Sequence, residues 1–111
     1  MHPQDAIKRG IVDGVEVLVS NARGSCLAGV AITDGVTPGV VLMATGAWFD
    51  ASDSLLERHG NPNVLTMDRG TSSLAQASSA LSALVEIAPW SEGEPPEVQA
   101  FELPVLCPLA K

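Results

Sequence analysis

The chain has 111 residues, with 13 acidic and six basic side chains and a formal net charge of −7. Its length is that of one domain, and 46% hydrophobic residues suffice for one core. This negative charge argues against binding to nucleic acids or anionic membranes, because both require a cationic surface. No apolar run approaches the ~18 residues that a membrane span needs. The first ten residues also lack the apolar stretch of a signal peptide.

The beginning of the chain predicts a short helix followed by a strand. Asp5 is expected to cap a helical turn over residues 6–9, which Gly10 ends. Apolar and polar side chains then alternate over residues 15–19, a period of two that is typical of a half-buried strand.

The remaining elements follow from apolar runs separated by turn-forming residues. We expect a turn over 21–24 and strands over 26–33, 40–44 and 84–87. The predicted elements between the last two strands are a short helix over 52–58, an extended segment over 64–66 and a helical turn beginning within 71–73. The helical turn is predicted because Ser73 and Gln76 have the spacing of a capping box. From residue 89 the chain loses its periodicity and reads as an extended tail.

Metal and nucleophile chemistry is poorly supplied. His2 and His59 lie far apart, and no histidine or cysteine pair has the spacing of metal ligands. There is no Gly-x-Ser-x-Gly turn, no Walker loop and no Gly-x-Gly-x-x-Gly. Cys26 and Cys107 are too few and too widely spaced for a disulfide scaffold, so buried free thiols are expected, although their pairing stays open.

Residues 59–76 are rich in side chains that can form hydrogen bonds, and their sequence is typical of a loop. One interpretation is an ordinary polar loop, and the other is a site for a flat heterocycle such as guanine or a pterin. Carboxylate and amide groups pair with the N–H, amino and carbonyl edge of such a ring. The polar residues are Asn61, Asn63, Thr66, Asp68, Thr71, Ser72 and Gln76. A helix that starts at residues 70–72 would also offer backbone N–H groups to a phosphate.

Two aromatic residues follow the predicted strand over 40–44. Trp48 and Phe49 are either core residues or a wall beside a bound ring, and Asp50 is adjacent to them.

Several motifs, spread over nearly the whole chain, resemble those of one family. They are His2-Pro3-x-Asp5-Ala6, Arg9-Gly10-Ile11-x-Asp13-Gly14, Asn21-x-Arg23-Gly24, Thr33-Asp34-Gly35, Pro38-Gly39-Val40-Val41, Thr45-Gly46-Ala47-Trp48-Phe49-Asp50, His59-Gly60-Asn61-Pro62-Asn63-Val64-Leu65-Thr66, Asp68-x-Gly70-Thr71-Ser72-x-Leu74-Ala75-Gln76 and Pro95-Pro96-x-Val98-x-Ala100-Phe101. The chain resembles the C-terminal molybdopterin-dinucleotide-binding domain of the dimethyl sulfoxide reductase superfamily. Within it, the trimethylamine N-oxide and biotin sulfoxide reductase branch is most similar.

The resemblance implies an all-β fold with short helices, a double-psi β-barrel of the aspartate decarboxylase-like type that here lacks its first strand. It implies a domain that closes over molybdenum bis(molybdopterin guanine dinucleotide) together with the rest of a larger reductase of S-oxides or N-oxides. The residue that ligates molybdenum lies in another domain, so this chain is expected to be inactive alone. The implied cofactor-binding residues are Asn61, Asn63, Thr66, Asp68, Gly70, Thr71, Ser72, Gln76, Trp48 and Asp50.

The resemblance also implies a barrel over residues 1–88, an extended tail over 89–111, and no membrane insertion. Relatives divide between the periplasm and the cytoplasm, and this chain carries no targeting signal. Two positions depart from the pattern, because Ala51 replaces a common proline and Ala77 stands where the branch has glycine.

Two other functions are weighed against this one. A truncated copy of the domain would be a non-catalytic interaction module. A pyruvoyl-dependent decarboxylase on the same barrel would cleave a Gly-Ser bond, and Gly24-Ser25 is present, but the tyrosine that such enzymes use is absent because the chain has no tyrosine.

Overall fold

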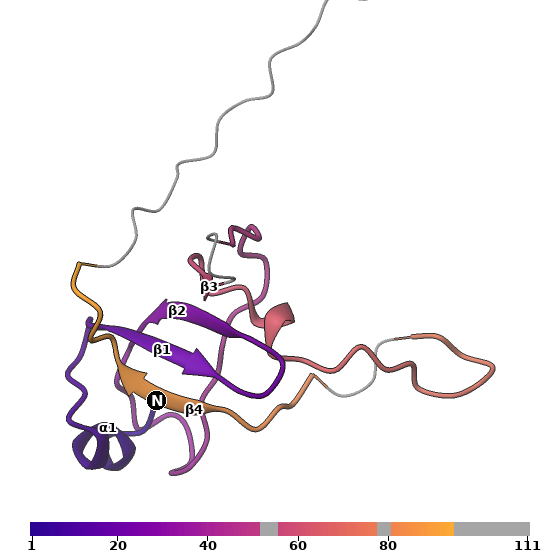
Figure 1. Ribbon diagram of the computed structural model, residues 1–111. Coiled ribbons are helices and arrows are strands. Elements are labelled where there is room, and N and C mark those ends of the chain that lie inside the picture. Colours follow the sequence, from indigo (N-terminus) through magenta and orange to yellow (C-terminus); the bar gives the residue numbers. More distant parts are fainter. Residues whose placement is uncertain (52–55, 78–80, 95–111) are drawn as a thin grey trace, which may run out of the picture.

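The computed structural model describes residues 1–51, 56–77 and 81–94. The described part is built mainly from a small sheet, with little helix, which confirms the all-β expectation (Figure 1). Its elements are α1 (Pro3–Arg9), β1 (Glu16–Ser20), β2 (Ser25–Gly29), β3 (Leu56–Glu57), the 3₁₀ helix η1 (Pro62–Val64) and β4 (Glu86–Pro89). Among these residues no helix has the length and apolar character of a membrane span.

The four strands form one sheet in the order β3-β2-β1-β4. Strand β1 is antiparallel to both β2 and β4, whereas β2 and β3 are parallel. The register places Cys26 beside Val19 on one side and beside Glu57 on the other. A glutamate of the shortest strand therefore lies in a row with core residues.

The alternating pattern of the first strand is confirmed. Val17 and Val19 are 1% and 3% exposed, whereas Glu16, the first residue of β1, faces solvent. The two valines belong to a core that also contains Ala6, Ile11, Cys26 and Leu65. Helix α1 and the residues after η1 thus pack on the same side of the sheet.

Helix α1 is present, but its cap differs from the prediction. The imidazole Nδ1 of His2, not Asp5, accepts a hydrogen bond from the Gln4 N–H at 3.1 Å. Pro3 occupies the first turn, where a missing N–H costs nothing. Asp5 is buried, and its Oδ2 accepts the Gly39 N–H at 2.6 Å, so this carboxylate fixes the distant 33–40 segment instead.

Several predicted elements are wrong or shifted. The strand predicted over 26–33 ends at Gly29, and the last strand starts at Glu86 rather than at residue 84. Residues 40–44 form no strand, since none of the described strands pairs with them. The apolar side chains of Val40 and Leu42 are exposed, not buried in the core.

Three predictions in the middle of the chain are corrected by the structure. The predicted helix over 52–58 ends in a strand, β3, and residues 52–55 lie outside the described part. The segment 64–66, predicted to be extended, begins within η1, which ends at Val64, and Leu65 caps this helix with helical backbone angles. Residues 71–77 form bends and no helix.

The turn predicted over 21–24 is present and is tightly constrained. Asn21 Oδ1 accepts the N–H groups of Arg23 and Gly24 at 2.9 and 3.3 Å, an arrangement typical of asparagine at turns. Glycine is required at position 24 because a Cβ there would lie 2.7 Å from the Val64 carbonyl oxygen. The hairpin and η1 therefore touch through their backbones.

We predict that Gly24→Ala destabilises the chain by about 1–3 kcal/mol, the usual cost of forcing an atom into a packed contact. The obstacle is a backbone oxygen, which cannot rotate away. Urea unfolding followed by circular dichroism measures this change. Gly29→Ala is the matched control, since a Cβ at that strand position meets no atom within 4 Å. Equal unfolding midpoints for the two variants would contradict the close approach.

Candidate functional site

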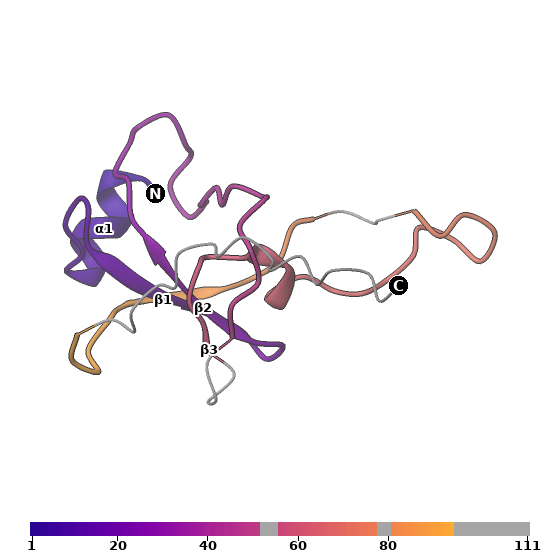
Figure 2. The same ribbon diagram turned by 90° about the horizontal axis from the view of Figure 1, so that it is seen from above.

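The residues expected to line a ligand lie in two separate parts of the structure. Trp48, Asp50 and Asn61 lie around β3, at one edge of the sheet. The others lie on or next to a segment that extends away from the sheet in both ribbon views (Figures 1 and 2). We call its described residues, 66–77 and 81–84, the arm.

Glu57 is the centre of the first part, the residues around β3. The sequence did not predict its role. It is 0% exposed. Its Oε1 accepts the N–H groups of Asp50 and His59 at 3.2 and 2.9 Å, and its Oε2 accepts the Asn61 N–H at 2.6 Å. Burial of a carboxylate is costly unless such donors compensate it. The side chain therefore fixes two loops, one before and one after β3.

Asn61 is one of the expected ligand residues, and its side chain is used within the chain. Its Oδ1 accepts the Asn63 N–H at 3.0 Å and caps η1. Its Nδ2 donates to the Ala47 carbonyl at 3.0 Å. Asn61 thus joins the loop that carries Trp48 to the loop that begins the polar stretch.

Asp50 forms an ion pair with Arg58 and lies beside His59, the two residues that follow Glu57. Its Oδ1 lies 2.7 Å from Arg58 Nη2, and its Oδ2 lies 3.5 Å from His59 Nε2. Both Asp50 Oδ2 and His59 Nε2 are buried without a hydrogen bond. Asp50 and His59 thus place buried polar atoms without a hydrogen bond next to each other.

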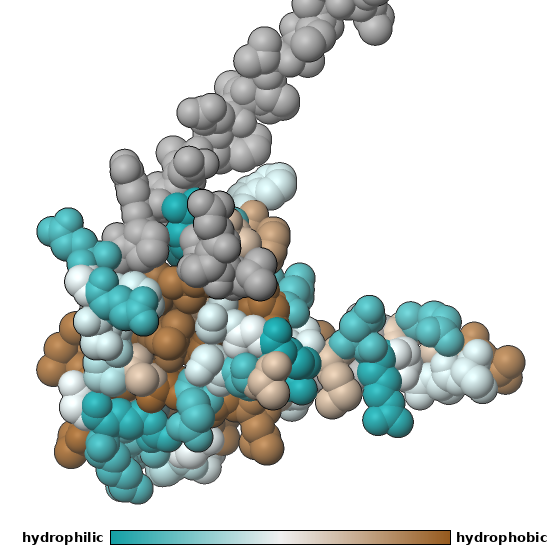
Figure 3. Space-filling view, in the orientation of Figure 1, coloured by the Kyte–Doolittle hydropathy of each residue, from teal (hydrophilic) through white to brown (hydrophobic). Residues whose placement is uncertain are grey.

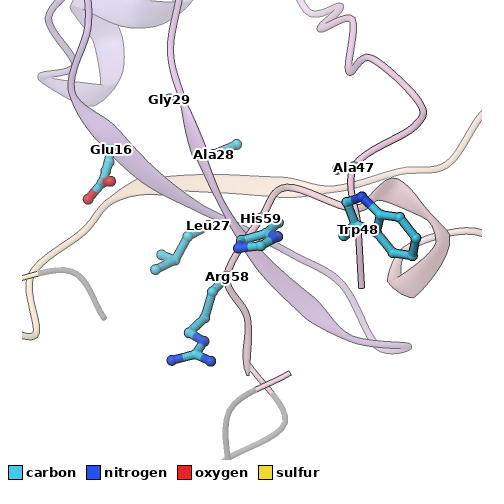
Figure 4. A pocket seen from close by; sticks show the side chains of 8 residues that line it. All are labelled: Glu16, Leu27, Ala28, Gly29, Ala47, Trp48, Arg58 and His59. Atoms are coloured by element: carbon cyan, nitrogen blue, oxygen red, sulfur yellow. The ribbon is translucent and has the colours of Figure 1, made fainter. Parts of the chain in front are cut away.

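A shallow pocket of about 330 Å³ opens beside these groups. Figure 4 shows Glu16 and Trp48 at its opposite ends, with Leu27 and His59 between them. The complete lining is Glu16, Leu27, Ala28, Gly29, Ala47, Trp48, Arg58 and His59. Trp48 is 69% exposed, so its ring is a surface wall and not a core residue. Phe49 is also exposed, at 65%.

The base of the arm is held by the hairpin turn. Asn21 Nδ2 donates to the carbonyl of Leu65 at 2.8 Å and to that of Leu84 at 3.2 Å. Arg23 Nε donates to the same Leu65 carbonyl at 2.8 Å. Because these carbonyls lie at the two ends of the arm, Asn21 fixes where it leaves the body. The sequence marked Asn21 as a turn residue but gave no signal for this second contact.

The outer part of the arm closes on itself. Thr71 N–H donates to the Ala77 carbonyl at 3.1 Å, and Ser72 N–H donates to the Ala75 carbonyl at 3.1 Å. These donors are therefore not available to a phosphate, and the helix start predicted at residues 70–72 is wrong. Ser72 Oγ caps the bend by accepting the Ala75 N–H at 2.8 Å. The predicted capping box of Ser73 and Gln76 is replaced by this serine turn.

The remaining expected residues differ in exposure. Gly70 lies under the side chain of Gln76, since a Cβ there would be 2.6 Å from Gln76 Oε1. Thr66 is half-buried, and its hydroxyl donates to the Asn63 carbonyl at 3.4 Å. The exposed members are Asn63, Asp68, Thr71, Ser72 and Gln76. The structure thus presents one set of hydrogen-bonding side chains on the arm, and a separate aromatic wall beside β3.

Metal ligation by the described residues has no structural support. Residues 1–51, 56–77 and 81–94 contain no group of three or more His, Cys, Asp or Glu side chains that could hold a metal ion.

Cys26 is a buried free thiol, as expected, and it lies next to Glu57 in the sheet. Burial, and secondarily the negative charge of Glu57, raise the pKa of Cys26 from 9.0 to about 11. The thiol is therefore protonated and unreactive near neutral pH. Cys107 lies outside the described residues.

We predict that Glu57→Gln destabilises the chain by about 1.5–3 kcal/mol, the range for hydrogen bonds to a charged group. In the variant, the amide NH₂ of glutamine replaces one carboxylate oxygen. This donor then faces backbone N–H groups that need an acceptor. The matched control is Glu86→Gln, an exposed glutamate in β4. Equal changes in the two unfolding midpoints would show that the buried carboxylate is not a structural centre.

A second prediction concerns Cys26 in a Cys107→Ser background, which leaves one thiol. Because the folded pKa lies above the unfolded value of 9.0, the unfolded chain loses its proton first as the pH rises. The free energy of unfolding should fall between pH 9 and about 11, and this fall should disappear in Cys26→Ala. An identical pH dependence in both variants would contradict the raised pKa.

Comparison with known proteins relates this geometry to a family. The family described as "Molydopterin dinucleotide binding domain" matches residues 1–84. A trimethylamine-N-oxide reductase of Salmonella typhimurium is 49% identical, over 95% of this chain and 13% of its own length. A biotin sulfoxide reductase of Cereibacter sphaeroides is 50% identical, over 78% of this chain and 12% of its own length.

A dimethyl sulfoxide/trimethylamine N-oxide reductase of Rhodobacter capsulatus is 46% identical, over 78% of this chain and 11% of its own length. The chain thus spans about 13% or less of these relatives, which contain further domains. The matched residues include α1, β1, β2, β3, η1 and the whole arm. The resemblance in the motifs is therefore confirmed, and the chain belongs to the molybdopterin dinucleotide-binding domain family.

Proposed function

We propose that this chain binds molybdenum bis(molybdopterin guanine dinucleotide) as one part of a larger oxidoreductase that reduces S-oxides or N-oxides. The observation that carries the proposal is the family match over residues 1–84, which includes both parts of the candidate site. When bound, the cofactor supplies the metal centre for oxygen-atom transfer. The role of this chain is to bind and orient the dinucleotide, and the chain alone is inactive.

The residues of the arm, together with Asn63 of η1, fit the chemistry of the pterin and guanine rings. Each ring edge offers N–H and amino donors beside a carbonyl acceptor. Asp68 is an exposed carboxylate that can only accept, while the amides of Asn63 and Gln76 can do both. The hydroxyls of Thr71 and Ser72 are exposed on the same segment. Together they provide the mixed set of partners that such edges require.

Gly70 and Thr66 complete this part of the proposed site in different ways. Gly70 lets Gln76 lie over the backbone, since any side chain at position 70 would displace the amide. Thr66 holds the turn after η1 through its bond to the Asn63 carbonyl. Both therefore act by placing the amides of Asn63 and Gln76.

The residues beside β3 form the second part of the proposed site. The exposed ring of Trp48 is suited to stack on a planar heterocycle. Asp50 orients Arg58 and His59 at the neighbouring pocket wall. Asn61 contributes by position, because both ends of its amide already bind the chain.

The phosphate groups of a dinucleotide need positive charge or free backbone donors. Thr71 N–H and Ser72 N–H are engaged, so they do not serve this purpose. Arg69 is the exposed cation of the arm. With a net charge of −7, the chain leaves most of the phosphate charge to the other domains of the enzyme.

We further propose that residues 1–88 belong to a double-psi β-barrel whose first strand lies outside this chain, and that 89–111 are a tail. The four-stranded sheet supports this proposal, because within the described residues β4 has an unpaired outer edge and the outer edge of β3 carries only a single bridge between Ala51 and Glu57. Strand β4 reaches Pro89, so the tail begins at the end of this strand.

A non-catalytic interaction module is the second candidate. The exposed Leu74 and Leu84, at 96% and 92%, favour it because they suit a protein partner. A stable complex formed without any dinucleotide is its signature. No observation favours the decarboxylase, since the turn and the close contact with Val64 account for Gly24.

The proposed function is tested in a chimera, a full-length trimethylamine-N-oxide reductase in which this chain replaces the matching segment. Asn63→Ala and Gln76→Ala should each weaken cofactor retention, since a lost buried hydrogen bond costs roughly 1–3 kcal/mol. Molybdenum and guanine contents of the purified proteins measure retention.

Thr37→Ala, an exposed threonine distant in sequence from both parts, is the matched control for these substitutions. It should retain as much cofactor as the unsubstituted chimera. Unchanged molybdenum and guanine in both Asn63→Ala and Gln76→Ala would remove these residues from the site. A chimera that contains no cofactor at all would contradict the proposed function.

A further inference from the structure

The arm carries large apolar side chains that the chain itself does not cover. Leu74 and Leu84 are 96% and 92% exposed, and Leu81 and Met67 are 66% and 60% exposed. Figure 3 shows hydrophobic residues among polar ones along the segment that extends from the body. Single exposed leucines are common, but four such side chains on one protruding segment indicate a contact surface.

Hydrogen bonds hold the base of the arm to the hairpin turn and shape its outer bend. At its base, Asn21 and Arg23 bind the carbonyls of Leu65 and Leu84. Near its end, the hydroxyl of Ser72 accepts the N–H groups of Leu74 and Ala75 at 3.3 and 2.8 Å. The backbone at Leu74 is thus ordered by internal bonds while its side chain projects into solvent. Such preorganisation lowers the cost of binding a partner.

We propose that the arm is the surface by which this chain docks onto the preceding domains of the longer reductase, with Leu74 and Leu84 as the main contacts. The inference rests on the proposed function, because it takes the chain as one part of such an enzyme. Relatives are long enough to supply this partner, since the chain spans 13% of the first of them. The partner surface is apolar, with polar groups opposite the hydroxyls of the arm.

Charge and sequence favour this occupant over a second copy of the chain. Two copies would each bring a net charge of −7, which opposes their association. The polar residues proposed for the cofactor alternate with the apolar ones on the same segment, as with Asp68 beside Met67 and Gln76 near Leu74. A partner that also holds the dinucleotide would therefore cover both kinds of side chain.

Hydrogen exchange of the arm tests the proposal by comparing the isolated chain with the chimera. Amides of residues 67–77 and 81–84 should exchange at least tenfold more slowly in the chimera, while those of α1 should exchange at similar rates in both. Leu74→Ser with Leu84→Ser should abolish this difference. The matched control is Ile7→Ser with Val12→Ser, which replaces residues that are 79% and 62% exposed away from the arm and should keep it.

The effect of the cofactor on arm protection is distinguished from that of the partner domains by purifying the chimera from cells that cannot make the pterin. Protection that persists without cofactor supports docking onto protein, and protection that needs the cofactor overturns it. A chimera with a protected arm but no cofactor in competent cells supports docking while the proposed function fails. Equal exchange in the chimera and in the isolated chain overturns the proposal.

The other possible occupants leave distinct signs in the isolated chain. Arm protection that rises with protein concentration shows that a second copy covers the surface, and this overturns the proposal. Protection that disappears when residues 95–111 are removed shows that the chain's own tail covers it, with the same consequence. Circular dichroism of the serine variants should match the parent chain, because the substituted residues are exposed.

Discussion

The carboxylate of Glu57 is the interaction on which the part of the structure around β3 depends. Removing a charge from water costs roughly several kcal/mol. Hydrogen bonds from backbone donors offset that cost here. Three N–H groups, from Asp50, His59 and Asn61, converge on it. The loops before and after β3 are thereby fixed relative to each other, together with the Trp48 wall and the Asp50 ion pair.

The hairpin turn has the corresponding role for the arm. Asn21 uses its Oδ1 to close the turn and its Nδ2 to hold the carbonyls at the two ends of the arm. Gly24 allows η1 to approach within contact of this turn. A single asparagine thus connects the sheet to a distant segment, since Leu65 follows Asn21 by 44 positions in the chain. The two parts of the candidate site are both positioned by buried or half-buried polar side chains.

The sequence predicted what depends on local patterns. The alternation of Val17 and Val19 and the turn at Asn21 were predicted correctly, because periodicity and turn chemistry act over a few residues. That Leu56 and Glu57 form a strand was not foreseen, because β3 depends on pairing with β2, which lies far earlier in the chain. The motifs identified the family, but composition alone left residues 59–76 open between a polar loop and a heterocycle site. The separation of Trp48 from the arm is likewise a property of the fold.

We propose that the arm and the Trp48 wall beside β3 line the dinucleotide. A crystal structure of the cofactor-loaded chimera tests it most directly. We predict that side-chain atoms of Asp68, Gln76 and Ser72 lie within about 3.2 Å of ring or phosphate atoms of the cofactor, a hydrogen-bonding distance. We also predict that the Trp48 ring faces a planar part of it. A bound cofactor that touches neither the arm nor Trp48 would contradict the account.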